Sequence, residues 1–177
     1  MRGIILYGPP ASGKDTITHA LSTADPQCRL FRRLKAGAGK SSTYRMVSIE
    51  HLEELKRQGD IAWTNSRYGA TYAIDIRELR AALRDRIPIL HLGQIEAIPT
   101  VKSAISEASW LVVELWCRRD LAAERLAQRD PSDAEERLRV WDQTAHLPGP
   151  DLDIDTGRVD PTEAAGAILS ALTPATQ

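Results

Sequence analysis

The sequence predicts an α/β fold in which a doubly wound parallel sheet carries a small insert. Two observations predict the sheet: apolar runs of strand length recur along the chain, and stretches with helical spacing of apolar residues separate them. A third is the Gly- and Pro-rich turn at residues 8–14, directly after the first apolar run. Strands that alternate with helices are typical of a parallel sheet covered on both faces.

The composition limits the classes of function. A chain of 177 residues predicts one domain, 1–177. With 23 basic and 24 acidic side chains the net charge is −1, so we do not expect non-specific binding to nucleic acid or to membranes. Cys28 and Cys117 lack metal-ligand spacing, and we interpret them as free thiols of a cytoplasmic protein. The sequence shows neither a signal peptide nor a membrane-spanning run.

The turn after the first expected strand, Ile4 to Tyr7, has the spacing of a P-loop. Gly8, Gly13 and Lys14 match the pattern G-x-x-x-x-G-K. Glycines let successive N–H groups point at a phosphate, and the positive end of the following helix adds to the attraction. We therefore expect ATP to bind to these loop residues: Gly8, Pro9, Pro10, Ala11, Ser12, Gly13, Lys14, Asp15 and Thr16.

The segment of about 28–72 is predicted to form an antiparallel-looking insert. It begins with an extended, basic run and continues into a Gly-rich loop and short strands. Its helix is expected over 49–58, with Ser48 as the N-cap.

Strands and helices then alternate to the end of the chain. Buried strands are expected over 87–92, 110–117 and 152–155, and helices over 76–86, 94–108, 120–128, 132–146 and 160–172. Pro99 should kink or divide its helix.

With these elements in order, the chain resembles the guanylate kinase family of P-loop nucleoside monophosphate kinases over nearly its whole length. The motifs that carry the resemblance are Gly8 to Lys14, Arg32-Arg33-Leu34-Lys35-Ala36-Gly37 with the later Tyr44, and Tyr68-Gly69. The resemblance implies a P-loop kinase fold. It also implies that the acceptor phosphate is held by Arg32, Lys35, Tyr44 and Tyr68, a role that suits charge-assisted donors.

The positions that would read guanine differ from the family. Residues that match the family's polar readers are Cys28, Ala62 and Ala70, none of which can replace the lost hydrogen bonds. Because a site built around polar partners discriminates strongly, their loss removes that selectivity. We expect the acceptor to keep its phosphate but not to be guanine nucleotide.

The magnesium site is also expected to differ. The family has a hydroxyl after the P-loop lysine and an aspartate pair at the end of the strand that follows the insert. This chain has Asp15 at the first position and reads His91-Leu92-Gly93 at that strand end. We expect Asp15 to be a ligand of Mg²⁺, the alternative being a carboxylate that only stabilises the helix start. His91 either contacts the acceptor or is a hydrogen-bonded core histidine.

The resemblance also implies an arginine-bearing lid, which is expected over about 125–137. The resemblance assigns Arg125, Arg129 and Arg137, together with Lys14, to stabilisation of the transferring phosphoryl group. Residues four apart share a helix face, so Arg125 and Arg129 can close together.

The sequence therefore predicts a kinase that uses ATP and Mg²⁺ to phosphorylate a small phosphorylated acceptor, a nucleoside monophosphate first. Ribose 1,5-bisphosphate phosphokinases share the Gly-Lys-Asp pairing and are the alternative enzyme class. A non-catalytic guanylate-kinase-like binding module is the second alternative, which Lys14 and the lid arginines disfavour.

Overall fold

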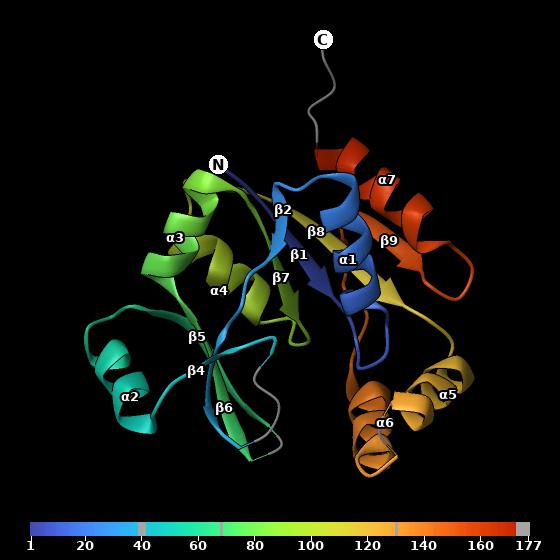
Figure 1. Cartoon of the computed structure of the whole chain (residues 1–177), viewed down its shortest axis with the longest axis horizontal. Helices are drawn as coiled ribbons and strands as arrows, with labels where there is room; N and C mark the ends of the chain where they lie inside the picture. Colours follow the sequence, from blue (N-terminus) through green and yellow to red (C-terminus); the bar gives the residue numbers. More distant parts are fainter. Residues whose placement is uncertain (39–41, 68, 130, 173–177) are drawn as a thin grey trace.

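The central sheet is parallel and has five strands in the order β2-β7-β1-β8-β9 (Figure 1). A computed structural model describes residues 1–38, 42–67, 69–129 and 131–172. The strands are β1 (Arg2–Tyr7), β2 (Cys28–Leu30), β7 (Ile87–Leu92), β8 (Ser109–Trp116) and β9 (Leu152–Asp155). Each neighbouring pair is parallel, as the recurrent apolar runs predict.

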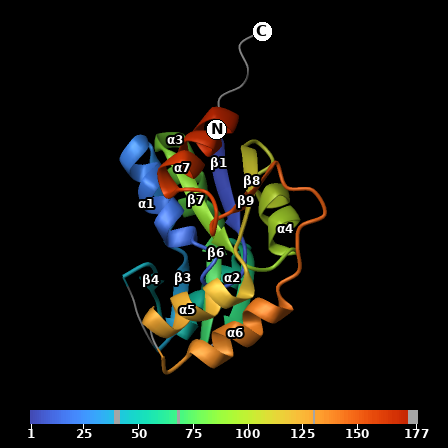
Figure 2. The ribbon, with the colours of Figure 1, turned by 90° about the vertical axis from the view of Figure 1, so that its right-hand side faces the viewer.

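Helices cover both faces of this sheet, so the predicted doubly wound α/β fold is confirmed. Side chains alternate along β1: Ile4 and Leu6 pack toward α1 (Lys14–Ala24) and α7 (Pro161–Leu172). Ile5 packs toward α3 (Ile76–Asp85) and α4 (Ala97–Ala104) on the opposite face. Figure 2 shows α1 and α4 on opposite sides of β1. None of the helices in the described ranges has the length and apolar character of a membrane span.

The insert has its own sheet, in the order β4-β3-β6-β5. Its elements are β3 (Leu34–Gly37), β4 (Arg45–Met46), α2 (Ile49–Arg57), β5 (Ile61–Arg67) and β6 (Ala70–Asp75). The predicted start at residue 28 is wrong, because Cys28 pairs in parallel with Ile87 in the central sheet. Extended, basic residues lie on both sides of that boundary, so the sequence shows no break there.

Two helix starts differ in how well the sequence predicted them. Ser48 caps α2 as expected, and its side chain accepts a hydrogen bond of 3.1 Å from the His51 N–H. The helix expected over 94–108 is shorter, since α4 begins at Ala97. Pro99 therefore lies in the first turn, where a proline costs no hydrogen bond, and it neither kinks nor divides the helix.

The lid expected over about 125–137 falls on the end of α5 (Arg119–Arg129) and the start of α6 (Ala134–Gln143). Both helices lie at the same end of the central sheet as the insert (Figure 1). The chain returns from α6 past the buried carboxylate of Glu114 on β8. That carboxylate accepts a hydrogen bond from the Leu147 N–H and lies 2.9 Å from Nδ1 of His146. The return segment is thus fixed to the sheet, and α5 and α6 extend beyond it.

Truncation of a core leucine tests this packing. Leu90 on β7 is fully buried, so Leu90→Ala should lower the free energy of unfolding by about 2–5 kcal/mol. Ile49 at the start of α2 is 49% exposed, and Ile49→Ala should change the free energy of unfolding by no more than about 0.5 kcal/mol. Urea denaturation measures both, and equal losses would contradict the assigned core.

Candidate functional site

One cavity of about 950 Å³ lies at the carboxyl ends of the central strands, between the insert and the lid. Its walls come from the P-loop, from the insert strands and from both lid helices. Ligands of doubly wound folds bind at this edge of the sheet. The cavity is therefore the candidate functional site.

The P-loop forms a tight turn after β1, and both of its motif glycines have conformations that other residues rarely adopt. Gly8 has φ 152° and lies so close to the Leu115 carbonyl that a Cβ would collide with it. Gly13 has φ 94°, with the Thr156 side chain beside it. Thr156 donates a hydrogen bond of 3.0 Å to the Ser12 carbonyl, which fixes the loop to the end of β9.

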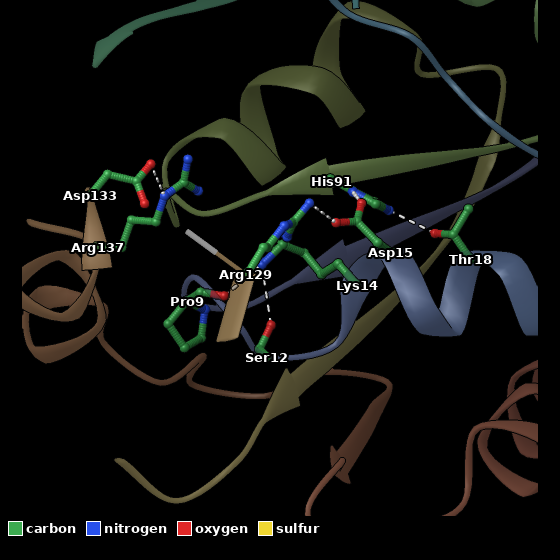
Figure 3. Close-up of polar contacts among 9 residues, drawn as sticks. All are labelled: Pro9, Ser12, Lys14, Asp15, Thr18, His91, Arg129, Asp133 and Arg137. Carbon is green, nitrogen blue, oxygen red and sulfur yellow. Dashed lines mark hydrogen bonds and ion pairs between the residues drawn. The ribbon is translucent and has the colours of Figure 1, made fainter. Parts of the chain in front are cut away.

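Lys14 folds back over this loop (Figure 3). Its Nζ donates to the carbonyls of Gly8 and Pro9 at 2.6 and 2.7 Å, and to Oγ of Ser12 at 3.1 Å. Burial lowers the pKa of Lys14 to about 7, with Arg33 and Arg129 adding to the effect while Asp15 opposes it. An anion in the loop would restore the charge, so the lysine suits a phosphate ligand.

Asp15 and His91 lie side by side across the start of α1 (Figure 3). Nδ1 of His91 is 3.7 Å from Oδ1 of Asp15, and its Nε2 forms a hydrogen bond of 2.7 Å with the Thr18 hydroxyl. Burial lowers the pKa of His91 far below its ordinary value, and nearby Lys14 lowers it further. The imidazole is thus neutral, and Thr18, which no sequence motif marks, holds its orientation.

Mg²⁺ would find one carboxylate here rather than a complete set of protein ligands. Within the described ranges, no group of three Asp, Glu, His or Cys side chains is placed to hold a metal. Asp15 is half-exposed and lines the cavity beside Lys14. Mg²⁺ commonly binds through one or two carboxylates, water and substrate phosphates, so this arrangement fits the ion.

A cationic and aromatic cluster occupies the insert side of the cavity. The rings of Tyr44 and Tyr72 are 5.1 Å apart between centroids. Nζ of Lys35 lies 5.6 and 5.7 Å from those centroids, and Cζ of Arg33 lies 5.8 and 5.6 Å from them. Two cations beside two phenols are donors that could bind an anionic group such as a phosphate.

The predicted acceptor residues divide into those on the cavity and those away from it. Lys35, Tyr44 and His91 line it, whereas Tyr68 lies outside the described residues. Arg32 is exposed and donates to the Tyr44 carbonyl at 2.6 Å, and it does not line the cavity.

Arg33 and Tyr72, which the sequence reasoning passed over, take places on that wall. Residues two apart in an extended chain point the same way, so the alternation of Arg33 with Lys35 was a usable signal.

None of the three expected base-reading positions lines the cavity. Ala62 packs against the core under α3 and α4, Ala70 is buried behind a separate shallow pocket, and Cys28 is buried beneath α1. Asn65 and Arg67 of β5 line the cavity instead.

The three lid arginines all line the cavity but have different partners. Arg125 donates to the Ala11 carbonyl at 3.1 Å and to the Thr156 carbonyl at 2.9 Å. Arg129 reaches across the cavity to Oδ2 of Asp15 at 3.1 Å. Arg137 donates to Oδ2 of Asp133 at 2.6 Å (Figure 3). Arg125 is thus bound to the P-loop, and Arg129 connects the lid with the start of α1.

Comparison with known proteins identifies the fold but not the activity. No family model and no curated protein matches the sequence. Among solved structures, guanylate kinase from Anaplasma phagocytophilum matches with a TM-score of 0.66 and 14% identity, over 96% of this chain and 83% of that one. The chain has a guanylate kinase-like P-loop fold. The structure titled APE1195 matches with a TM-score of 0.59 and 17% identity, over 96% of this chain and 93% of that one. At sequence identities this low, the likeness shows the fold alone.

Thiol labelling tests the placement of Cys28. Burial raises the pKa of the Cys28 thiol to about 11 and also raises that of Cys117, and both side chains are fully buried. Only thiolates react readily, so neither cysteine of the native protein should react with a disulfide reagent at pH 8. Two thiols should react after denaturation in guanidinium. Rapid labelling of native Cys28 would place it on an open surface.

Proposed function

We propose that this protein is a kinase that uses ATP and Mg²⁺ to phosphorylate the phosphate group of a small acceptor, with a nucleoside monophosphate as the first candidate. The observation that carries the proposal is that one cavity is lined by the P-loop, the cationic and aromatic cluster of the insert, and the lid arginines. A donor phosphate at one wall and an acceptor phosphate at another would face each other beneath the lid.

The reaction follows from the groups that line the walls. Backbone N–H groups of the P-loop and Nζ of Lys14 hold the ATP phosphates, while Arg33, Lys35, Tyr44 and Tyr72 hold the acceptor phosphate. An acceptor oxygen attacks the γ-phosphorus, the bond from that phosphorus to the β–γ bridging oxygen breaks, and ADP leaves. The acceptor phosphate is already ionised and needs no general base. Arg125, Arg129 and Arg137 stabilise the charge on the transferring group.

Asp15 is the residue that would hold Mg²⁺. When bound, the ion neutralises the β- and γ-phosphate oxygens of ATP. Neutral His91, fixed by Thr18, lies next to the Asp15 carboxylate without adding a positive charge that would compete with the metal. Arg129, now paired with Asp15, would be freed to contact the phosphoryl group.

A sugar-phosphate kinase is the second candidate, because Arg67 of the insert also lines the cavity. Its guanidinium forms no hydrogen bond or ion pair with another residue in the described ranges. It lies on β5 two residues from Asn65, on the same face of the strand. A second phosphate on the acceptor would give Arg67 a partner, as in a ribose 1,5-bisphosphate-type acceptor or product.

An acceptor panel tests the proposed function. The purified protein, ATP and Mg²⁺ are incubated with each ribonucleoside monophosphate, ribose 5-phosphate and ribose 1,5-bisphosphate, and ADP is measured. At least one acceptor should raise ADP formation well above the rate with ATP alone. Lys14→Met should lower that rate about 100-fold or more, because it removes a charge that contacts the transferring phosphate. ADP formation that no acceptor stimulates would contradict the proposal.

Arg33 and its neighbour Arg32 form a matched pair of variants. Arg33→Ala should raise KM for the acceptor roughly 10- to 100-fold, because a charge-assisted phosphate contact is lost. Arg32→Ala removes the same charge outside the cavity and should change KM by less than about 3-fold. Steady-state kinetics with a varied acceptor measures both. The opposite order would restore the sequence-based assignment of Arg32.

Asp15→Asn tests the metal role. The activating Mg²⁺ concentration should rise about 10-fold or more, because the amide is a poorer ligand for a hard cation. Asp25→Asn removes the same charge at the other end of α1 and is the control. Direct Mg²⁺ titration in the presence of ADP provides a readout besides turnover. An unchanged Mg²⁺ dependence would show that Asp15 only stabilises the helix start.

A further inference from the structure

A row of three side chains crosses the insert sheet on the face that lines the cavity. Lys35 on β3 is opposite Tyr72 on β6, and Tyr72 is in turn opposite Asn65 on β5. All three line the cavity. Neighbouring strands are about 4.8 Å apart, so the Asn65 backbone lies roughly 10 Å from that of Lys35. The row thus begins at the proposed phosphate site and ends at a neutral carboxamide.

The Asn65 carboxamide carries an oxygen that lacks a partner among the described residues. Its Oδ1 is buried and accepts no hydrogen bond from any of them. Buried polar atoms are nearly always paired, so each exception requires an explanation. The other described side-chain atoms in this condition are the Nε1 atoms of Trp63, Trp110 and Trp141, and none of these residues lines the cavity. Asn65 alone among the four is placed to meet a ligand.

We infer that Asn65 binds the part of the acceptor that lies beyond its phosphate, and that this part carries a hydrogen-bond donor for Oδ1. The inference rests on the proposed function for the identity of the phosphate site. A carboxamide both accepts and donates, so it matches a group that offers a donor beside an acceptor. Two kinds of group have this chemistry. One is the edge of a nucleobase, with which an Asn side chain can form two hydrogen bonds, and the other is a sugar hydroxyl.

This assignment differs from the sequence-based one. Ala62 and Ala70 were expected to face the base, and both lie away from the cavity. Asn65 is three residues beyond Ala62 on β5, and it becomes a cavity residue through its register with Tyr72. Discrimination between acceptors is therefore expected to come from Asn65 on β5.

Calorimetry on the full chain tests the inference. Wild type, Asn65→Leu and Asn65→Ala are titrated with the ribonucleoside monophosphates, ribose 5-phosphate and inorganic phosphate. Both variants should bind the best ligand of the panel about 5- to 100-fold more weakly than wild type, because a buried hydrogen-bonding partner is lost. Inorganic phosphate should bind all three equally. Ser66→Ala, which changes the next residue on the opposite face of β5, should bind like wild type.

The two sources separate within the same data. Weaker binding of nucleotides with unchanged binding of ribose 5-phosphate assigns Asn65 to the base, and an equal loss for both assigns it to a sugar hydroxyl. The inference is overturned if both Asn65 variants bind like wild type, or if only the Leu variant is affected. It is also overturned if the affinity for inorganic phosphate falls by the same factor as that for the organic ligand, or if wild type binds no organic phosphate. Binding that depends on Asn65 without phosphoryl transfer would refute the proposed kinase alone, and transfer that ignores Asn65 would refute this inference alone.

Discussion

The close approach of the P-loop to the ends of β8 and β9 is the constraint on which the rest of the site depends. Gly8 must pass the Leu115 carbonyl without a Cβ, and Gly13 must take a positive φ beside Thr156. Thr156, which follows β9, and Arg125 on α5 donate hydrogen bonds to carbonyls of the loop. Lys14, at the start of α1, donates to another of its carbonyls. A loop fixed in this way presents its N–H groups in a geometry set before any ligand arrives.

The electrostatics of the site follow from that geometry. Lys14 is buried against carbonyl oxygens, and Asp15 follows it directly on α1 with Arg129 and His91 on either side. The carboxylate thus lies between a lid cation and a neutral imidazole. A bound phosphate would take over contacts that Lys14 and Arg129 now make with the protein, and a divalent cation would take over those of Asp15. In the proposed kinase, the pairing of Arg129 with Asp15 would connect the position of α5 to the ligands bound at the P-loop.

The sequence predicted the parallel sheet and the P-loop well, because both leave local signals. Apolar runs mark strands buried on two faces, and the glycine spacing marks a turn that few residues can adopt. The proposed acceptor wall was harder to predict, since it depends on the register between strands of the insert sheet. Tyr72 and Asn65 reach the cavity through pairing of β5 with β6, which no local pattern specifies. Alternation around Lys35 did contain the signal for Arg33, whereas the partner of His91, Thr18, comes from a different element.

In the proposed kinase, one cavity holds a donor and an acceptor phosphate at the same time. The most direct measurement is the affinity of a dinucleoside pentaphosphate, which joins the two ligands through one phosphate chain, compared with that of ATP. Linking two occupied sites should make the joined ligand bind at least about 100-fold more tightly than ATP. Equal affinities for pentaphosphates that carry each of the common bases would mean that the insert side of the cavity does not take a nucleoside monophosphate, and would contradict the first candidate function.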